Sequence, residues 1–437
     1  MKAYPAYKDS GLPWVEKIPD HWESLPNIAI FDERIERGFV NDELLSVTQN
    51  RGVIRQSELQ EKKDISNEDK SAYKKVRIGD IAYNKMRMWQ GAVGYSAFEG
   101  IISPAYVVLK PKRQLNPRFF HYLLRTPAYI NESYRNSYGI CDDQLSLRFF
   151  NFKRMYSIIP TLLEQDAIVA FLEAKEAEIQ HFIDNQKRQI ELLTDLTAIS
   201  AERAVIQGIQ EHVPLRSSGI PWLGNIPVHW SALRLKFAIT RIEQGWSPQC
   251  DAQPAPPNRW GVLKVGCVNG DSFNEEENKT LPETLAPIPD LEIQSGDIMV
   301  SRANSRELVG SAALVEACRP KLMLCDKLFR FRARKQLALP KYIVLALRTS
   351  ATRRQLEAEA TGASSSMLNI AQSSLRNVWV PLPRLPEQER IVAFVEKLRR
   401  EVSQNIVRVE AQLSRMEEYR TALISAAVTG KIDVRNA

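Results

Sequence analysis

The amino-acid sequence predicts an α+β protein in which two globular domains are joined by two long antiparallel coiled-coil helices, with an internal pseudo-twofold repeat. Three observations support this prediction. The chain contains two similar halves, each half begins with a turn-rich segment of short apolar runs, and each half ends in a long run of apolar residues at heptad spacing. A length of 437 residues also exceeds what one hydrophobic core usually organises, so two or more folding units are expected.

The duplication is carried by two pairs of short segments. Residues 10–22, SGLPWVEKIPDHW, return as residues 218–230, SGIPWLGNIPVHW, and eight of the thirteen positions are identical. A second pair, LEQDAIVAF at 163–171 and PEQERIVAF at 386–394, shares six of nine positions. Because the period is far longer than that of solenoid or propeller repeats, each copy is expected to be a domain with its own attachment.

The first part of each copy has the pattern of short strands with one helix. Apolar runs at 106–109 and 261–265 are typical of strands. Asn116 and Pro117 supply an N-cap and a first-turn proline for a helix expected to run to about residue 131. Pro340 opens the matching stretch, expected to run to about residue 359.

The second part of each copy is predicted to be one long helix that ends near a glycine, Gly208 in the first copy and Gly430 in the second. Ile183, Ile190, Ile406 and Leu413 sit one place off a strict heptad, so the seam is wider than a pure a/d stripe or carries a stutter. Neither helix can bury its stripe alone, and antiparallel packing of the two is the simplest solution. The predicted seam residues are Ile168, Leu172, Ile179, Phe182, Leu193, Ile391, Val395, Leu398, Val402, Val409 and Met416.

The composition is that of an ordinary globular protein with a basic charge. Hydrophobic residues make up 44% and charged residues 25%, which argues against disorder. A net charge of +7 favours association with phosphate backbones. The five cysteines are odd in number and form no Cys-x-x-Cys pair, which argues against a disulfide framework and a zinc site. No segment resembles a signal peptide or a membrane span, so we expect a cytoplasmic protein without a membrane partner.

The order of these segments resembles the specificity subunits of Type I restriction-modification enzymes. The motifs Ser-Gly-x-Pro-Trp with Ile-Pro-x-His-Trp, and LPEQERI at 385–391, are characteristic of that family, and the likeness covers the full length. The resemblance implies target-recognition domains at 1–159 and 213–382, and spacer helices at 160–212 and 383–437. It also implies a non-catalytic subunit that reads a split, asymmetric sequence in double-stranded DNA, one half with each domain. Two modification (methyltransferase) subunits would dock on this chain, and restriction (motor/nuclease) subunits would join them.

The candidate DNA-reading residues lie in polar loops that mix basic, amide and aromatic side chains. Two of these loops follow the repeated Gly-Asp-Ile tripeptides at 79–81 and 296–298. Arginine suits guanine edges, asparagine and glutamine suit adenine edges, and lysine suits phosphates. Further candidate loops are 48–51, 139–144, 244–248 and 362–366. The predicted DNA-binding residues are Asn84, Lys85, Arg87, Trp89, Gln90, Arg51, Gln144, Gln244, Trp246, Arg302, Asn304, Ser305, Arg306, Ser364 and Ser365.

The repeated tryptophans and histidines have a simpler structural interpretation. His21 and His229 invite a metal or acid-base role. They lie in proline-punctuated segments without partner ligands in the sequence, so packing of each domain's first segment onto its core or onto the helices is the better account.

Two other classes of function compete with DNA reading. An enzyme acting on DNA by itself would need a glycine-rich cofactor loop with an Asn/Asp-Pro-Pro-Tyr/Phe tetrapeptide, or a phosphate-binding Gly-x-x-x-x-Gly-Lys-Ser/Thr loop, and the sequence contains neither. We therefore expect no catalytic residue, no cofactor and no metal, and expect the chemistry to come from partners. A coiled-coil adaptor whose globular ends bind proteins remains the alternative, because duplication, helix seam and basic charge are all compatible with it.

Overall fold

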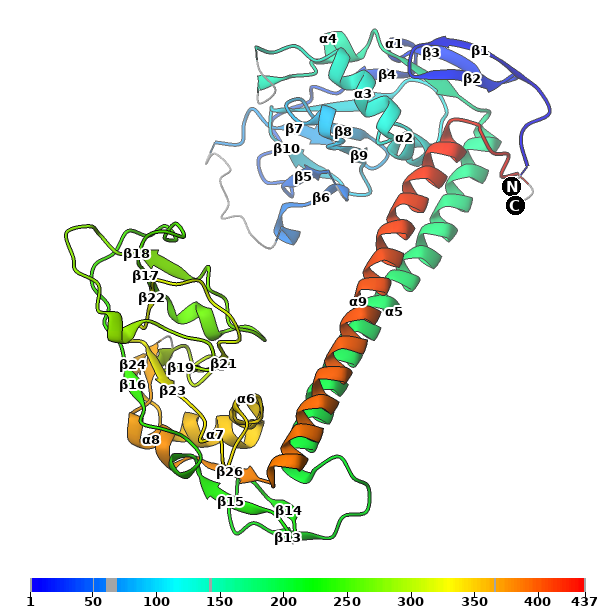
Figure 1. The fold of residues 1–437 in the computed structure, drawn as a ribbon. Coiled ribbons are helices and arrows are strands. Elements are labelled where there is room, and N and C mark those ends of the chain that lie inside the picture. The colour runs from blue at the N-terminus through cyan, green and yellow to red at the C-terminus, as the bar shows by residue number, and fades with distance from the viewer. Residues whose placement is uncertain (1, 50, 60–68, 141–143, 365–366, 436–437) are drawn as a thin grey trace. The chain divides into compact units, whose positions relative to one another are not determined.

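The computed structural model describes residues 2–49, 51–59, 69–140, 144–364 and 367–435. The chain forms two compact units, Met1–Arg188 with Val409–Ala437, and Gln189–Arg408. Each unit contains one globular part and one part of each of two long helices, α5 (Leu162–Gln207) and α9 (Leu385–Val428) (Figure 1). The prediction of an α+β fold with two long helices is therefore confirmed.

The globular part of the first unit is built on a four-stranded antiparallel sheet in the order β4-β11-β8-β9. Three strand pairs, β3 with β12, β5 with β6 and β7 with β10, and the hairpin β1-β2 accompany this sheet. The strands are β1 (Tyr7–Leu12), β2 (Val15–Pro19), β3 (Glu23–Pro26), β4 (Phe31–Glu33), β5 (Leu45–Thr48), β6 (Gly52–Arg55), β7 (Lys74–Val76), β8 (Ile81–Asn84), β9 (Val93–Tyr95), β10 (Gly100–Ile102), β11 (Tyr106–Pro111) and β12 (Tyr156–Ile159).

The second unit repeats this plan with additions. Its four-stranded antiparallel sheet has the order β16-β23-β19-β21, β15 pairs with β26 as β3 does with β12, and the hairpin β13-β14 matches β1-β2. Two three-stranded sheets, β18-β17-β22 and β20-β25-β24, complete this unit, and single bridges between Leu44 and Ile101 and between Tyr138 and Ser146 take the place of some of these strand pairs in the first unit. The strands are β13 (Leu215–Ser217), β14 (Asn225–Pro227), β15 (Ser231–Arg234), β16 (Glu243–Gln244), β17 (Gly261–Leu263), β18 (Asn278–Thr280), β19 (Ile298–Ser301), β20 (Ala303–Asn304), β21 (Ala312–Leu314), β22 (Leu322–Met323), β23 (Leu328–Phe331), β24 (Thr361–Ser364), β25 (Met367–Asn369) and β26 (Trp379–Leu382).

The short helices differ from the prediction of one helix in each globular part. The stretch after Asn116 forms two helices, because Thr126 has an extended backbone and accepts a hydrogen bond from the Tyr129 amide as the cap of a second helix. Thr349 interrupts the matching stretch in the same way. The prediction of single helices from 116 to about 131 and from 340 to about 359 was therefore wrong. The short helices are α1 (Asn27–Ile30), α2 (Pro117–Leu123), α3 (Pro127–Arg135), α4 (Phe149–Phe152), α6 (Pro340–Arg348), α7 (Ser350–Glu359) and α8 (Gln372–Asn377).

Each unit has its own hydrophobic core, and the long helices contribute to both. In the first unit Phe119 and Phe120 of α2 belong to the same buried cluster as Ile168 and Leu172 of α5. In the second unit the cluster around Tyr342 includes residues from both long helices, among them Val205 and Ile391. Burying this apolar area removes it from water and fastens each globular part to the helices, so the attachment is a continuation of the core rather than a separate joint.

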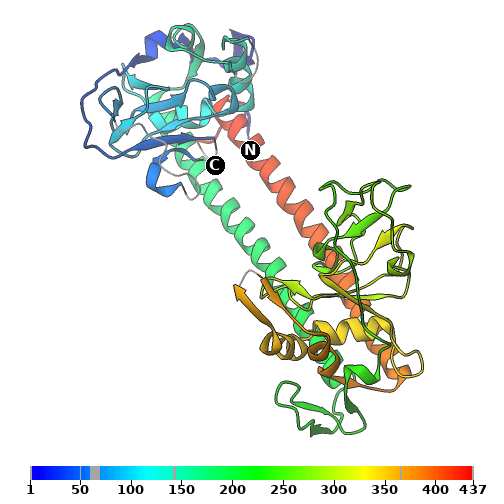
Figure 2. The ribbon, with the colours of Figure 1, turned by 90° about the vertical axis from the view of Figure 1, so that its left-hand side faces the viewer.

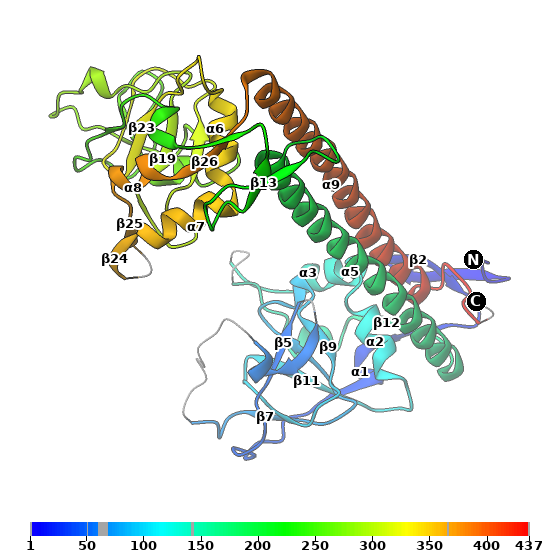
Figure 3. The same ribbon diagram turned by 90° about the horizontal axis from the view of Figure 1, so that it is seen from below.

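The two long helices pack on each other along an apolar seam (Figures 1 and 3). In the first unit Ile179 and Ile183, in the first half of α5, belong to the same cluster as Leu413 and Met416, in the second half of α9, as antiparallel packing requires. From residue 179 to residue 197, buried or partly buried positions of α5 recur at 179, 183, 186, 190, 193 and 197, with alternating spacings of four and three residues. The seam therefore includes Ile183 and Ile190, and the predicted Phe182, which is half-buried as Ile190 is, widens it on one side. On α9 the corresponding positions are 402, 406, 409, 413, 416, 420 and 423.

The repeated Trp and Glu-Gln motifs meet in space. Glu164, in the first turn of α5, accepts hydrogen bonds from His21 Nε2 at 2.8 Å and from Trp22 Nε1 at 3.4 Å. In the second unit His229 Nε2 lies 3.1 Å from Glu387 in the first turn of α9. Burial opposes the charge of Glu164, but the hydrogen bonds from His21 and its neighbours lower its pKa below the usual value. The histidines thus fasten each domain's first segment to a helix start.

The buried glutamine of each motif connects the start of a long helix to the loop before α2 in the first unit and before α6 in the second. Gln165 accepts a hydrogen bond from the Asn116 amide at 2.8 Å and donates to the Pro160 carbonyl at 2.9 Å. Gln388 accepts from the Leu339 amide at 2.9 Å and donates to two carbonyls, those of Pro383 and Leu337. The two copies therefore use the same residue type for the same join.

The end of each long helix meets a repeated tryptophan. Gly430 has a φ of +73° and leaves no room for a side chain, since Pro19 and Trp22 lie against it. Gly208, with a φ of +83°, lies against Trp230 in the second unit. Residues after α9 continue to the first domain, where the Asp433 amide donates to the Lys2 carbonyl at 2.8 Å, so the two ends of the chain lie together in the first unit (Figure 2).

Candidate nucleic-acid interface

In the first unit, the loop after β8 is held in shape by its own polar groups. Asn84 Oδ1 accepts from the Met86 amide at 2.9 Å, and Trp89 Nε1 donates to the Met86 carbonyl at 3.0 Å. Gln90 Oε1 accepts from Arg87 at 3.2 Å. Among the described residues no acceptor is recorded for the amide group of Gln90, which leaves two donors for a ligand.

The structure brings Gln49, from the second predicted loop at 48–51, beside the first loop, while residue 50 lies outside the described residues. Gln49 Nε2 donates to Gln90 Oε1 at 2.7 Å, and Arg51 pairs with Glu58. Arg125, at the end of α2, donates to the Gln49 carbonyl at 2.5 Å and to the Val93 carbonyl at 3.1 Å. The partly buried Arg125 thus ties this loop to the sheet, and the Gln49–Gln90 hydrogen bond joins the two loops.

A partly buried histidine, His121, supports the same region. His121 Nδ1 accepts from the Tyr95 amide at 3.3 Å, and its ring lies against Gly52 and Gly94, where a Cβ atom would collide with it. Burial first, and then the charges of Arg125 and Arg118, lower the pKa of His121 to about 3. The unprotonated ring is therefore part of the packing beneath the loop that follows β5.

We expect this histidine to make the first unit sensitive to acid. Between pH 7 and pH 5 the unfolded chain takes up a proton near the ordinary value of about 6.5 that folded His121 does not, so stability falls with falling pH, by about 2 kcal/mol from this group. His121→Asn keeps an acceptor near Nδ1 without the titration. Urea denaturation of the full chain at both pH values should therefore show a smaller loss for the variant, and equal losses would show that His121 is not the source.

A third segment reaches the loop after β8 from α3. Tyr138 and Ser146 pair as an antiparallel bridge, and the Leu147 amide donates to the Lys85 carbonyl at 2.9 Å. Gln144 is exposed, while residues 141–143 of the predicted loop lie outside the described residues. Tyr138 and Ile140 are 82% and 96% exposed, and the sequence prediction did not single them out. Exposed apolar side chains at a loop tip are the signal that could have found them.

In the second unit the predicted loops meet around Asp326. Gln244 Nε2 donates to the Asp326 carbonyl at 3.0 Å, Arg302 donates to the same carbonyl at 3.5 Å, and Ser247 bonds to the Asp326 carboxylate. Trp246 is half-buried against a core cluster, which favours a packing role for its ring. Asp326, absent from the predicted set, is therefore the residue that brings two predicted loops together.

The loop after β19 pairs with the segment that carries the predicted serines. Asn304 in β20 pairs with Leu368 in β25, and its side chain bonds to Asn269 at 3.0 Å and to the Ser305 amide at 2.9 Å. Ser364 ends β24, and Ser365 lies outside the described residues. Arg306 is exposed, and its side chain makes no hydrogen bond or ion pair with any of the described residues.

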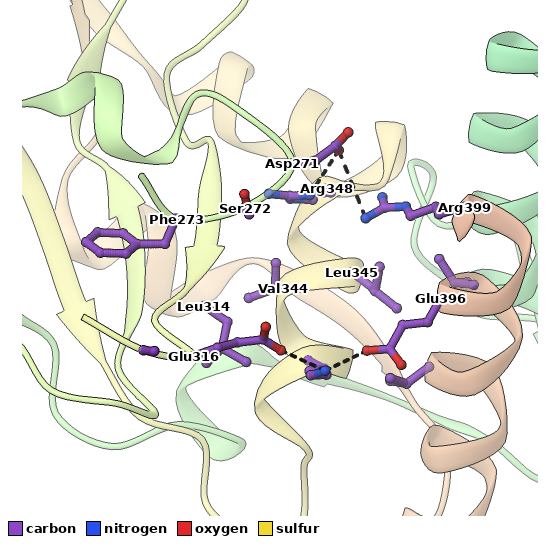
Figure 4. A pocket seen from close by; sticks show the side chains of 14 residues that line it. Asp271, Ser272, Phe273, Leu314, Glu316, Val344, Leu345, Arg348, Glu396 and Arg399 are labelled. Atoms are coloured by element: carbon purple, nitrogen blue, oxygen red, sulfur yellow. Dashed lines mark hydrogen bonds and ion pairs between the residues drawn. The ribbon is translucent and has the colours of Figure 1, made fainter. Parts of the chain in front are cut away.

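A hollow of about 360 Å³ in the second unit lies between α6 and α9 (Figure 4). Its floor is apolar, and its charged rim is internally paired. Lys341 lies 2.7 Å from Glu316 and 2.6 Å from Glu396, while Arg348 and Arg399 face Asp271 at 3.3 and 4.0 Å. Since these rim charges are paired with one another, the hollow does not present an unpaired charged site.

A second hollow, in the first unit, has the opposite character. Its volume is about 600 Å³, and its lining includes Lys74, Lys85, Arg148 and Lys153 with a single carboxylate, Glu33. Of these residues only Lys85 belongs to the predicted set. The others come from β7 and from the region of α4, far away in the sequence, which is why loop composition alone did not find them.

Membrane-spanning helices and clusters of metal ligands are both absent among the described residues. No helix among them is long and apolar enough to cross a membrane. Within the same ranges, no three His, Cys, Asp or Glu side chains gather in a way that could hold a metal ion.

Sequence comparisons find a specificity domain in the second half of the chain. The family model for the Type I restriction modification DNA specificity domain matches residues 261–411. The Type I restriction enzyme EcoEI specificity subunit of Escherichia coli is 35% identical over 204 residues, which cover 46% of this chain and 34% of the relative. The match therefore spans about a third of that relative's length.

Solved structures with the same fold cover almost the whole chain. A chain from work on complex assembly and conformational transition of the type I R-M system has a TM-score of 0.65 at 16% identity, over 95% of this chain and 100% of that one. The HsdS subunit from Thermoanaerobacter tengcongensis has a TM-score of 0.56 at 18% identity, over 95% and 98% of the two chains. At these identities the likeness concerns the fold.

Proposed function

We propose that this chain reads a bipartite, asymmetric target in double-stranded DNA, one half with each unit. The match of residues 261–411 to the Type I restriction modification DNA specificity domain and the similarity to a Type I specificity subunit support this proposal. The methyl transfer and the cleavage would come from methyltransferase and restriction subunits that assemble on it.

The observation that carries this proposal is the repeated placement of polar loops after equivalent strands. The loop from Asn84 to Gln90 begins at the last residue of β8, and Arg302 to Arg306 follow β19, each strand lying third in the order of its four-stranded sheet. Each unit then brings other polar loops beside this one. The two sets differ in side chains, as two domains that read different bases require, and arginine with amide side chains can read base edges in the major groove.

Exposed apolar residues on the long helices support the docking of partner subunits. Leu192, Leu196 and Ile199 of α5 lie on one face at spacings of four and three residues and are 46%, 59% and 63% exposed. A continuous apolar stripe left in water on a helix is typical of a protein-binding face. We assign it to a methyltransferase subunit.

Arg306 offers a direct test of the base-reading role. We expect Arg306→Ala, in the full chain assembled with its methyltransferase subunits, to weaken binding to the recognised sequence about 10- to 100-fold and to relax the preference at one base pair, because a bidentate contact to a guanine would be lost. Mobility-shift titrations on the recognised duplex and on single-base variants measure both effects.

Lys335→Ala is the matched control, since Lys335 is also an exposed cation of the second unit but lies outside the candidate loops. Binding within about twofold of the wild type is expected there. An unchanged preference in Arg306→Ala would remove this arginine from the interface. Absence of any preferred sequence in the wild type would favour the protein-binding adaptor instead.

A further inference from the structure

The hollow in the first unit, lined by Lys74, Lys85, Arg148 and Lys153, differs from the charged hollow beside α9 because most of its cations have no partner. Only Lys74 is neutralised, since its Nζ lies 2.8 Å from Glu33 and 3.0 Å from the Tyr106 carbonyl. The side chains of Lys85 and Arg148 make neither a hydrogen bond nor an ion pair with any residue that the structure describes. Lys153 lies over the ring of Phe150, 5.0 Å from its centroid.

The cations of this hollow repel one another, which raises the free energy of their charged forms. Burial and the nearby Lys74 and Arg148 lower the pKa of Lys85, which means that its charged form is held at a cost. An anion placed among these groups would remove the repulsion and replace the water lost on burial. The geometry thus favours a ligand with concentrated negative charge.

The chemistry of the lining selects phosphate over a nucleobase. A base edge is read by fixed donors and acceptors together, but the one carboxylate here is already engaged by Lys74. Lysine ammonium groups on flexible stems are point charges that suit phosphate oxygens. Phe150, 53% exposed, and Met86 flank the cations and offer apolar surface to the sugar beside a phosphate.

The hollow is continuous with the predicted reading loop. Lys85 and Met86 belong to the loop after β8, and the Lys85 carbonyl accepts from the Leu147 amide, directly before Arg148. We propose that this hollow binds one phosphodiester group of the DNA backbone and so fixes the position of the first unit against the bases that its loops read. This inference rests on the proposed function.

The second unit lacks the same site. There the Ile370 amide donates to the Arg302 carbonyl at 3.0 Å, which aligns Ile370 with Leu147 and Arg302 with Lys85. In that alignment Ala371 replaces Arg148 and Ser373 replaces Phe150. The phosphate contact is therefore a property of the first unit, and the second unit provides the control.

The test is equilibrium binding of the full chain, assembled with its methyltransferase subunits, to a duplex with the recognised sequence over a range of KCl concentrations. We expect the double variant Lys85→Gln with Arg148→Gln to bind recognised and scrambled duplexes more weakly by a similar factor, about 10-fold at low salt. The slope of log K against log salt should lose about 0.9, the value for one neutralised phosphate. Both side chains lack partners, so folding should be unchanged, as a urea midpoint would check.

A scan with methylphosphonate duplexes identifies the phosphate as part of DNA. Neutralising one backbone position should weaken the wild type about 10-fold and leave the double variant unaffected at that position. Arg376→Gln, at the second unit's counterpart of Lys153, should respond to the scan like the wild type. A double variant that keeps the full salt slope, or that changes the preferred sequence, would overturn the proposal. A wild type without any preferred sequence would instead count against the proposed function.

Discussion

Replacing residues 1–159 by the corresponding domain of a relative with a different target should change one half of the recognised sequence and leave the other half intact. The physical reason is that the two globular parts have separate cores, one around Phe119 and Phe120 and the other around Tyr342. The exchange should end before α5, since β12 pairs with β3 and must be replaced with it. Specific binding to the original site should fall towards the non-specific level, which is about 10³-fold or more weaker for typical DNA-reading proteins.

The chimera would be assembled with methyltransferase subunits. Mapping the sites that it methylates then shows which half of the recognised sequence has changed. Exchange of residues 213–382 is the matched experiment and should change only the other half. Both halves changing together in either chimera would contradict a division of the target between the two units.

Removing the buried amide of Gln388 should have the largest effect of any single substitution in the helix starts. Gln388→Leu removes the partner of the Pro383 carbonyl, which lies in a buried position, and of the half-buried Leu339 amide. The third partner, the Leu337 carbonyl, belongs to an exposed residue and can bond to water instead. A loss of about 2 kcal/mol or more is expected, because each buried polar group left unsatisfied costs about 1–3 kcal/mol. Urea denaturation of the full chain measures it.

Gln404→Leu, on an exposed position of the same helix, is the control and should change stability by less than about 0.5 kcal/mol. If the two variants were equally stable, the hydrogen bonds of Gln388 would not fasten the globular part to α9.

The long helices and the duplication could be predicted because their signals are local and periodic. Heptad spacing gave α5 and α9, and the glycines that end them have the positive φ values expected of helix C-caps. The break at Thr126 was missed, although a threonine before a proline is itself a helix-start signal. Apolar residues continue on both sides of Thr126, and this continuity predicts a single helix.

The candidate site could be predicted only in part, because its members come from distant segments. The loops after β8 and β19 are visible in composition, yet the bond between Gln49 and Gln90 depends on tertiary packing. The partner of His21 was missed for the same reason, since Glu164 lies 143 residues away. Arg148 directly precedes the short helix α4, and no sequence motif around it indicates a DNA-binding role.

Selection of bound DNA from a random-sequence duplex pool tests the central claim most directly. The full chain, assembled with its methyltransferase subunits, would be incubated with the pool at moderate salt, and the retained duplexes would be sequenced. We predict two short blocks of specified sequence, separated by a spacer of fixed length and free sequence, because each unit would read its own half. Retained duplexes without any enriched sequence would contradict the account.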